Sequence, residues 1–321
     1  MSAEIKVGIV GAGGMGVQHA EALSQIEGVK VVAVADVDAR RAEELARKFG
    51  AEALENFERM LPKVDAVYVC TPPDVRSPAL EALEAGKHVF CEKPLSVDLS
   101  EAKRLVEAAR RNGVILAVGY VLHFHPPFRE VALRARNGDL GDLLVIWINR
   151  MGMGGRKDWI LDPRRSGGMA VEFNTHDFEW LEWVGGPVRR VYGRVLRSSP
   201  EIRIETNVWA MLDYERGGVG VLGSSWSAPI GRSSFGVIGT KGMMAVECGA
   251  VKLAIEGRQE ALELKAEEPP LLSENKHFIE CIREGKEPEI DGERGIVGLE
   301  LPLAAQRSSA SGLPVDLPLA D

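Results

Sequence analysis

Cysteine, long apolar runs and clusters of basic residues are all scarce in this sequence. Only four of the 321 residues are cysteines, and they are too far apart for a paired metal-type spacing or a dense disulfide scaffold. No apolar run approaches the roughly 18 residues that span a bilayer, and the amino terminus lacks the apolar stretch of a secretory signal. We therefore expect a cytoplasmic protein with reduced cysteines and no membrane partner.

The charge is mildly acidic, because 39 basic residues face 47 acidic ones and leave a formal net charge of −8. Nucleic acid is not an expected partner, since phosphate binding needs a concentrated basic surface. Hydrophobic residues make up 45% of the chain and charged residues 27%, as in ordinary globular proteins. At about 150 residues per domain, the length predicts two domains, which we place at residues 1–121 and 122–321.

A glycine-rich turn follows the first apolar run of the chain. Residues 5–10 are typical of a buried parallel strand, and the next six, GAGGMG, fit the pattern G-x-G-x-x-G. In that pattern the first glycine allows a tight turn, the second lets the backbone approach a pyrophosphate, and the third lets the next helix pack closely. The phosphates would lie at the amino end of that helix. The cofactor-binding residues predicted in this turn are Gly11, Gly13, Gly14, Met15 and Gly16.

An acidic residue ends the second predicted strand. Residues 31–35 are apolar, and Asp36 follows them, 20 residues after Gly16. A carboxylate at this position accepts hydrogen bonds from the adenosine ribose and repels a 2′-phosphate. Arg40 and Arg41 could meet such a phosphate, but they also open a polar helix in which solvated arginines are expected. The prediction is therefore NAD as cofactor, with NADP as the alternative.

Strands and helices alternate through the first 121 residues. Further strands are predicted at 66–70, 88–91 and 115–118, with a capped amphipathic helix between the last two. This alternation predicts a doubly wound parallel sheet of the Rossmann type, in which ligands bind at the carboxyl ends of the strands. The residues that this rule brings to the edge with the glycine-rich turn are Asp36, Thr71, Pro72, Glu92 and Lys93.

After residue 122 the strands succeed one another without intervening helices. This order predicts an open, mainly antiparallel sheet with helices on one face, so the chain combines an α/β with an α+β domain. A helix capped by Asn174 or Thr175 should end at Gly185, and Pro302 should kink or break a later helix. The predicted strands are 143–149, 188–196, 204–213 and 219–226, the last two joined by a hairpin turn.

The segment 86–95, GKHVFCEKPL, resembles the signature of the glucose–fructose oxidoreductase, inositol dehydrogenase and rhizopine-catabolism (Gfo/Idh/MocA) family. The resemblance extends to CTPP at 70–73, to Glu172 with His176-Asp177, and to GLPVDLP at 312–318. It implies an NAD(P)-dependent oxidoreductase that acts on a CH–OH group of a sugar, polyol or inositol-like compound. It also implies an open-sheet domain that packs against a second subunit, so a homodimer or homotetramer is expected.

The resemblance gives catalytic roles to Lys93 and His176. Oxidation of a secondary alcohol sends a hydride to the nicotinamide and a proton to the protein. An imidazole, with an ordinary pKa of about 6.5, suits the proton transfer, and an ammonium would orient the hydroxyl and stabilise charge on its oxygen. Glu172, where aspartate is usual, precedes His176 by four residues and would fix its tautomer if that turn is helical. Glu92 is expected to hold Lys93 or a cofactor group.

Two aromatic side chains complete the predicted substrate site. His123 stands where the family usually has arginine. His123 and His125 are two residues apart, so in a strand their side chains would point to the same side. No carboxylate or cysteine lies at ligand spacing, so we predict no metal and assign His123 to the substrate. Trp159 would stack on a sugar ring or pack in the core. The predicted substrate contacts are Lys93, His123, Trp159, Glu172 and His176.

Two other functions stay open at this point. One is hydrolysis of a glycosidic bond with tightly bound, internally recycled NAD. The other is a cofactor-bound regulator, because a dinucleotide fold alone proves no turnover. The presence of both Lys93 and His176 favours the dehydrogenase.

Overall fold

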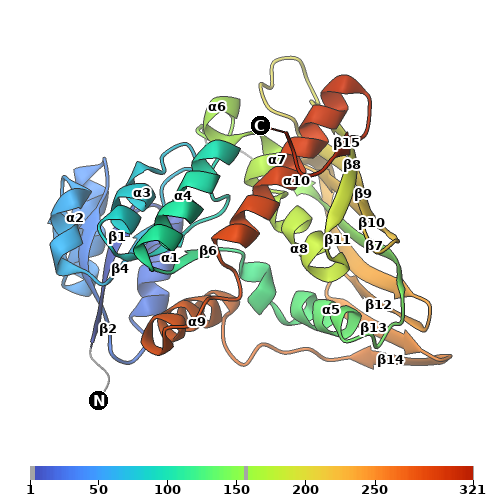
Figure 1. Cartoon of the computed structure of the whole chain (residues 1–321), viewed down its shortest axis with the longest axis horizontal. Coiled ribbons are helices and arrows are strands. Elements are labelled where there is room, and N and C mark those ends of the chain that lie inside the picture. The colour runs from blue at the N-terminus through green and yellow to red at the C-terminus, as the bar shows by residue number, and fades with distance from the viewer. Residues whose placement is uncertain (1–3, 155–157, 321) are drawn as a thin grey trace. The chain divides into compact units, whose positions relative to one another are not determined.

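The computed structural model describes residues 4–154 and 158–320, which form two compact units (Figure 1). The first unit comprises the described residues up to Val121 together with 268–296, and the second comprises the others. The chain first passes from one unit to the other between Val121 and Leu122, the position at which the sequence analysis divides the domains. Residues 268–296, which the sequence analysis assigned to the second domain, instead fold with the first. Their helix α9 (Pro270–Glu284) adds Phe278 and Ile279 to the core of that unit.

The first unit contains a six-stranded sheet in the order β3-β2-β1-β4-β5-β6, and all its pairings are parallel. The strands are β1 (Ile5–Val10), β2 (Val29–Ala35), β3 (Glu52–Leu54), β4 (Ala66–Val69), β5 (His88–Cys91) and β6 (Leu116–Val118). They alternate with α1 (Gly14–Leu23), α2 (Ala39–Phe49), the 3-10 helix η1 (Phe57–Lys63), α3 (Ser77–Glu84) and α4 (Leu99–Asn112). The predicted doubly wound parallel sheet is thus confirmed.

Local sequence explains why these elements begin and end where they do. The four residues of β4 are all buried, as expected for a parallel strand with helices on both faces. Helix α4 begins at Asp98, whose side chain accepts the Glu101 N–H at 2.8 Å. It ends at Gly113, a C-cap with φ +63°, where glycine avoids the steric cost of a left-handed backbone.

The second unit contains a nine-stranded sheet in the order β14-β13-β12-β11-β7-β10-β9-β8-β15. Neighbouring strands run antiparallel except β7 and β10, which pair in parallel, so the predicted mainly antiparallel sheet is confirmed. Five strands, β11 to β15, were not predicted. The strand bounds are β7 (Leu143–Met153), β8 (Val188–Leu196), β9 (Asn207–Tyr214), β10 (Val219–Ser225), β11 (Ser227–Gly239), β12 (Gly242–Glu247), β13 (Ala250–Ile255), β14 (Arg258–Leu262) and β15 (Val315–Asp316).

Helices of the second unit cover one face of this sheet, as predicted, and Figure 1 shows α5 and α8 together on that side. Phe128 of α5 stacks on Phe235 of β11, and Trp180 of α8 meets both rings edge-on. The helices that enter this unit are η2 (Val121–Phe124), α5 (Pro126–Arg136), α6 (Pro163–Ser166), α7 (Met169–Glu172), α8 (Thr175–Gly185) and α10 (Gly292–Ser311). Among the described residues, no helix combines the length and apolarity needed to cross a membrane.

The predicted break at Pro302 is wrong, because α10 continues through it from Gly292 to Ser311, and the alternative, a kink, stays a prediction. Proline has no N–H, so it leaves the carbonyl four residues earlier, that of Gly298, without its helical partner. The Thr175 hydroxyl donates to this carbonyl at 2.8 Å. A side chain at the start of α8 thereby replaces the missing hydrogen bond.

Candidate functional site

The glycine-rich turn joins β1 to α1 and leaves space for a ligand. Gly11 has φ +98°, and a Cβ there would lie 2.8 Å from the carbonyl carbon of Cys70. Gly16 is equally tight, because a Cβ on it would clash with the Gly11 carbonyl. Gly13 and Gly14, in contrast, have open space where a Cβ would be. Since no side chain caps α1, its first N–H groups are available to a phosphate, and the turn fits a dinucleotide.

Asp36 is fixed at the end of β2 by both carboxylate oxygens. Its Oδ2 accepts the Ala12 N–H at 2.7 Å, and its Oδ1 accepts the Asp38 N–H at 2.8 Å. The carboxylate is therefore tied directly to the glycine-rich turn. Arg40 and Arg41 are exposed, with Nε atoms 3.8 and 3.5 Å from Asp38. These positions favour a ribose hydroxyl over a 2′-phosphate beside Asp36.

A buried arginine, Arg76, joins the loop after β4 to the loop after β5. It is 1% exposed, and none of the described carboxylates lies within ion-pair distance of it. It donates to the carbonyl oxygens of Thr71 (2.9 Å), Glu92 (3.0 Å), Pro94 (2.8 Å) and Leu95 (2.8 Å). The predicted residues Thr71, Pro72, Glu92 and Lys93 are thus brought together. The sequence analysis missed Arg76, since a lone arginine before a helix is typical of a surface.

The Glu92 carboxylate is held from the other side by a second set of buried groups. One oxygen lies 2.8 Å from Nε2 of His19 in α1, and the other accepts the Lys93 backbone N–H at 3.1 Å. His19 is fully buried, and its Nδ1 faces the Asn275 amide of α9 at 3.1 Å. The expectation that Glu92 holds Lys93 is therefore met through the backbone. The Lys93–Pro94 peptide bond is cis.

A second carboxyl, Glu274, is buried in the same unit. It is 3% exposed, and within the described chain neither oxygen has a hydrogen-bond partner. Burial raises the pKa of Glu274 well above its usual range, and the nearby charge of Glu92 adds to the effect. The pKa of Tyr68 is raised in turn by burial and by the charge of Glu274. Both effects favour the protonated form of this carboxyl.

In the second unit, His176 lies in the first turn of α8 and is partly buried. The N-cap is Asn174, and its amide donates to Asp177 Oδ2 at 2.7 Å, which ties the turn to the residue after the histidine. Glu172 is the last residue of α7. Phe173 and Asn174 have right-handed helical backbone angles, so the path from Glu172 to His176 is nearly helical, as the four-residue spacing requires.

The strand predicted around His123 is wrong. His123 lies in the 3-10 helix η2, and His125 is the N-cap of α5, because two prolines at 126–127 begin that helix. His123 is fully buried, with Nε2 2.9 Å from both carboxylate oxygens of Glu179 and its ring stacked on Trp183 at 3.7 Å. These contacts give the imidazole a place in the core of the unit. Its contact with substrate stays a prediction.

Trp159 is half-buried in the turn before α6, and its carbonyl accepts the Asp162 N–H at 3.4 Å. Its stacking on substrate also stays a prediction. Within the described residues, no group of three or more His, Cys, Asp or Glu side chains is arranged to hold a metal ion.

Two family models match most of the chain. Residues 5–120 match an oxidoreductase family with an NAD-binding Rossmann fold, and residues 128–245 match the GFO/IDH/MocA C-terminal domain.

Named relatives are similar along nearly the full length. The chain is 31% identical to myo-inositol 2-dehydrogenase of Thermotoga maritima, over 95% of this chain and 96% of the relative. It is 29% identical to scyllo-inositol 2-dehydrogenase (NAD(+)) of Bacillus subtilis, over 99% and 97%. The structure is similar to that of a probable dehydrogenase from Thermotoga maritima, with a TM-score of 0.86 and 29% identity over 98% of this chain and 99% of the other.

Proposed function

Because the chain belongs to the Gfo/Idh/MocA family of oxidoreductases with an NAD-binding Rossmann fold, we propose that it oxidises a secondary alcohol of a sugar, polyol or inositol-like compound. The family and enzyme class expected from the sequence are confirmed, since the relatives are named dehydrogenases. The observation that carries the proposal is the placement of Lys93. Its loop is fixed by Arg76 and Glu92 next to the loop at Thr71, in the unit that holds the glycine-rich turn.

The roles of the side chains follow from the chemistry of alcohol oxidation. When bound, NAD supplies the hydride acceptor. The glycine-rich turn would hold its pyrophosphate and Asp36 its ribose. His176 takes the proton from the substrate hydroxyl, and the Lys93 ammonium orients that hydroxyl and stabilises negative charge on its oxygen. Glu172 holds the imidazole in the tautomer that accepts the proton.

A substrate panel tests this function. Purified protein would be mixed with NAD and with inositols, polyols and sugars, and NADH absorbance followed; each reaction would be repeated with NADP. We expect NADH formation with one compound class and a slower reaction with NADP. Release of an aryl alcohol from aryl glycosides without NADH accumulation would replace the dehydrogenase with the internally recycled hydrolase. NAD binding without turnover of any compound would point to a regulator.

We also propose that the solvent face of the nine-stranded sheet packs against a second copy of the chain. Large apolar side chains on this face alternate with buried residues that point toward the helices, as on β9. The exposed members include Tyr192 (40%), Leu196 (47%), Trp209 (47%), Met211 (49%) and Met243 (38%). An apolar face of this kind is typical of a protein interface. Light scattering after size exclusion would give the mass, and a monomer at micromolar concentration would refute the proposal.

The cytoplasmic location expected from the sequence stays a prediction. Fractionation of cells that produce the protein would test it.

A further inference from the structure

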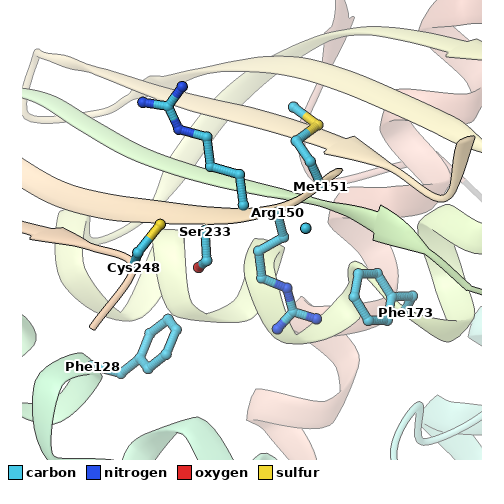
Figure 2. Close-up of a pocket in the computed structure, with 8 residues that line it drawn as sticks. Phe128, Arg150, Met151, Phe173, Ser233 and Cys248 are labelled. Atoms are coloured by element: carbon cyan, nitrogen blue, oxygen red, sulfur yellow. The ribbon is translucent and has the colours of Figure 1, made fainter. Parts of the chain in front are cut away.

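A cavity of about 510 Å³ opens on the second unit, and Figure 2 shows the side chains around it. Arg150 of β7 and Ser233 of β11 lie opposite each other in the sheet register. Phe128 of α5 and Phe173, between α7 and α8, also line the cavity. Because Phe128 stacks on Phe235, two residues beyond Ser233, the cavity lies on the helix-covered face of the sheet.

The Arg150 side chain is held in place from within its own unit. Its Nε lies 3.3 Å from Asp177 Oδ1, and its guanidinium carbon lies 4.1 Å from the centre of the Phe173 ring. Asp177 is 1% exposed at its side chain, whereas Arg150 retains 20%. Figure 2 shows the guanidinium beside Phe173, on the side of the strands where Phe128 lies. The side chain is therefore oriented before any ligand binds, which lowers the entropic cost of binding.

The terminal amino groups of Arg150 are available to a ligand. A guanidinium carries five N–H donors, and Asp177 occupies only the Nε side of this one. In the described part of the chain, neither terminal nitrogen has a hydrogen-bond partner, and no carboxylate lines the cavity. The planar fork of terminal N–H groups matches the paired oxygens of a carboxylate or phosphate. The phenyl rings of Phe128 and Phe173 supply apolar surface beside it.

The second arginine of the cavity, Arg232, does not share this role. It precedes Ser233 on β11, and successive side chains of a strand point to opposite faces. Its guanidinium is therefore on the solvent face of the sheet, opposite to that of Arg150. This difference supplies a matched control for Arg150.

The cavity adjoins the predicted acid/base. Phe173 precedes His176 by three residues of near-helical backbone, so the two side chains lie on the same side of that turn. Asp177, which anchors Arg150, directly follows His176. A ligand bound to Arg150 would thus lie next to the turn that carries the histidine.

We propose that Arg150 binds an oxyanion of the substrate, so that the physiological substrate is an anionic sugar or polyol derivative with a carboxylate or phosphate. This inference rests on the proposed dehydrogenase function and narrows its substrate class. Carboxylate and phosphate share the chemistry that the guanidinium recognises, and the test separates them.

The test compares matched neutral and anionic compounds. Values of kcat/KM with NAD would be measured for glucose, glucuronate and glucose 6-phosphate, and for myo-inositol and an inositol monophosphate. We expect the wild-type enzyme to prefer one anionic compound over its neutral partner by about tenfold or more, and Arg150→Met to abolish this preference through KM. Arg232→Met should retain it. Whichever anionic partner is preferred identifies the oxyanion.

A second variant and a second readout keep the test decisive. Arg150→Met removes the positive charge beside Asp177, so Arg150→Lys, which retains the charge but not the fork, should fold and still lose about tenfold in kcat/KM for the anionic compound. Calorimetric titration with glucuronate and with inorganic phosphate measures binding without turnover. If the wild type and all variants have their highest kcat/KM with neutral compounds, the inference about Arg150 is overturned, but the proposed dehydrogenase function is retained. No NADH from any compound would count against the dehydrogenase. In that case, equal calorimetric binding by wild type and Arg150→Met would overturn the inference as well.

Discussion

Two arginines, Arg76 of the first unit and Arg150 of the second, are held in opposite ways. Arg76 of the first unit donates to six backbone carbonyls and has no ligand-facing surface, since it is 1% exposed. Arg150 of the second unit is anchored at one nitrogen by Asp177 and opens into a cavity at its other end. Arg76 fixes the loop that carries Lys93, and Arg150 presents N–H donors to the cavity. On our proposal that Arg150 binds the substrate, the loop of Lys93 is held through backbone carbonyls, whereas the substrate meets side-chain donors.

This difference follows from what each site must recognise. The cofactor has the same shape in every turnover, so a closed network that fixes the loops around Lys93 suits it. A buried cation with neutral partners is costly unless its N–H groups are bonded, and the carbonyls around Arg76 meet that requirement. A substrate site is more open, because its donors must be completed by the ligand.

The largest expected effect separates chemistry from cofactor binding. His176→Ala should reduce kcat on the true substrate by about 10²-fold or more, because general acid/base catalysis contributes 10² to 10⁴. NAD affinity, measured by fluorescence titration, should stay within about twofold of wild type, since the substitution leaves the first unit untouched. An unchanged kcat would remove His176 from the mechanism. A loss of both kcat and NAD affinity would show that the second unit also contributes to cofactor binding.

The next effect is on stability and concerns Arg76. In Arg76→Met, six carbonyl oxygens lose a donor, and each buried unsatisfied group costs about 1–3 kcal/mol, so the free energy of unfolding should fall by about 3 kcal/mol or more. Urea unfolding would measure it, and NAD affinity should fall as well. The matched control is Arg111→Met, an exposed arginine 3.6 Å from Glu84, which should change stability by less than about 0.5 kcal/mol. Equal effects of the two substitutions would show that Arg76 does not hold the loops.

The same contrast explains which parts of the fold could be predicted. Five of the six strands of the first sheet were predictable because they are short apolar runs whose turns are marked by glycine and proline, whereas β3, with two exposed residues of three, was missed. β14 escaped prediction because four of its five residues are exposed, which leaves no apolar pattern. Residues 268–296 were assigned to the wrong unit because α9 contacts α1, and no local pattern encodes a contact between segments so far apart in the chain.

The candidate site divides along the same line. The glycine-rich turn, Asp36 and Lys93 lie in contiguous motifs, so spacing alone places them at the ends of strands. His19 and Asn275, in contrast, are 256 residues apart and meet only in the folded unit. Arg150 shows the same limit, since a strand arginine gives no indication that Asp177 anchors it and that a cavity lies beyond.

The smallest expected effect tests whether the closed network of the first unit carries a buried acid. The pKa of Glu274 is raised by burial and by Glu92, so above the ordinary value of 4.5 the folded state binds more protons than the unfolded state. The stability of the wild-type protein should therefore fall as the pH rises from 4.5 toward the folded-state pKa, by up to about 1.4 kcal/mol per pH unit. Glu274→Gln has no such titration. Its unfolding free energy should differ least from wild type near pH 4, and its relative stability should increase steadily toward pH 8.

Urea unfolding at several pH values would measure this difference, with Glu280→Gln, an exposed position on the same helix, as the control. The control should show a flat difference, since an exposed carboxyl is solvated in both states. If the difference between Glu274→Gln and wild type is also independent of pH, the folded unit stabilises the ionised carboxylate as well as water does. The first unit would then share the property that we assign to the second, a polar group held ready for a partner. NAD titration of the same variant would decide between these cases, because a carboxylate that serves the cofactor site would change NAD affinity on substitution, and a buried acid that only fills the core would not.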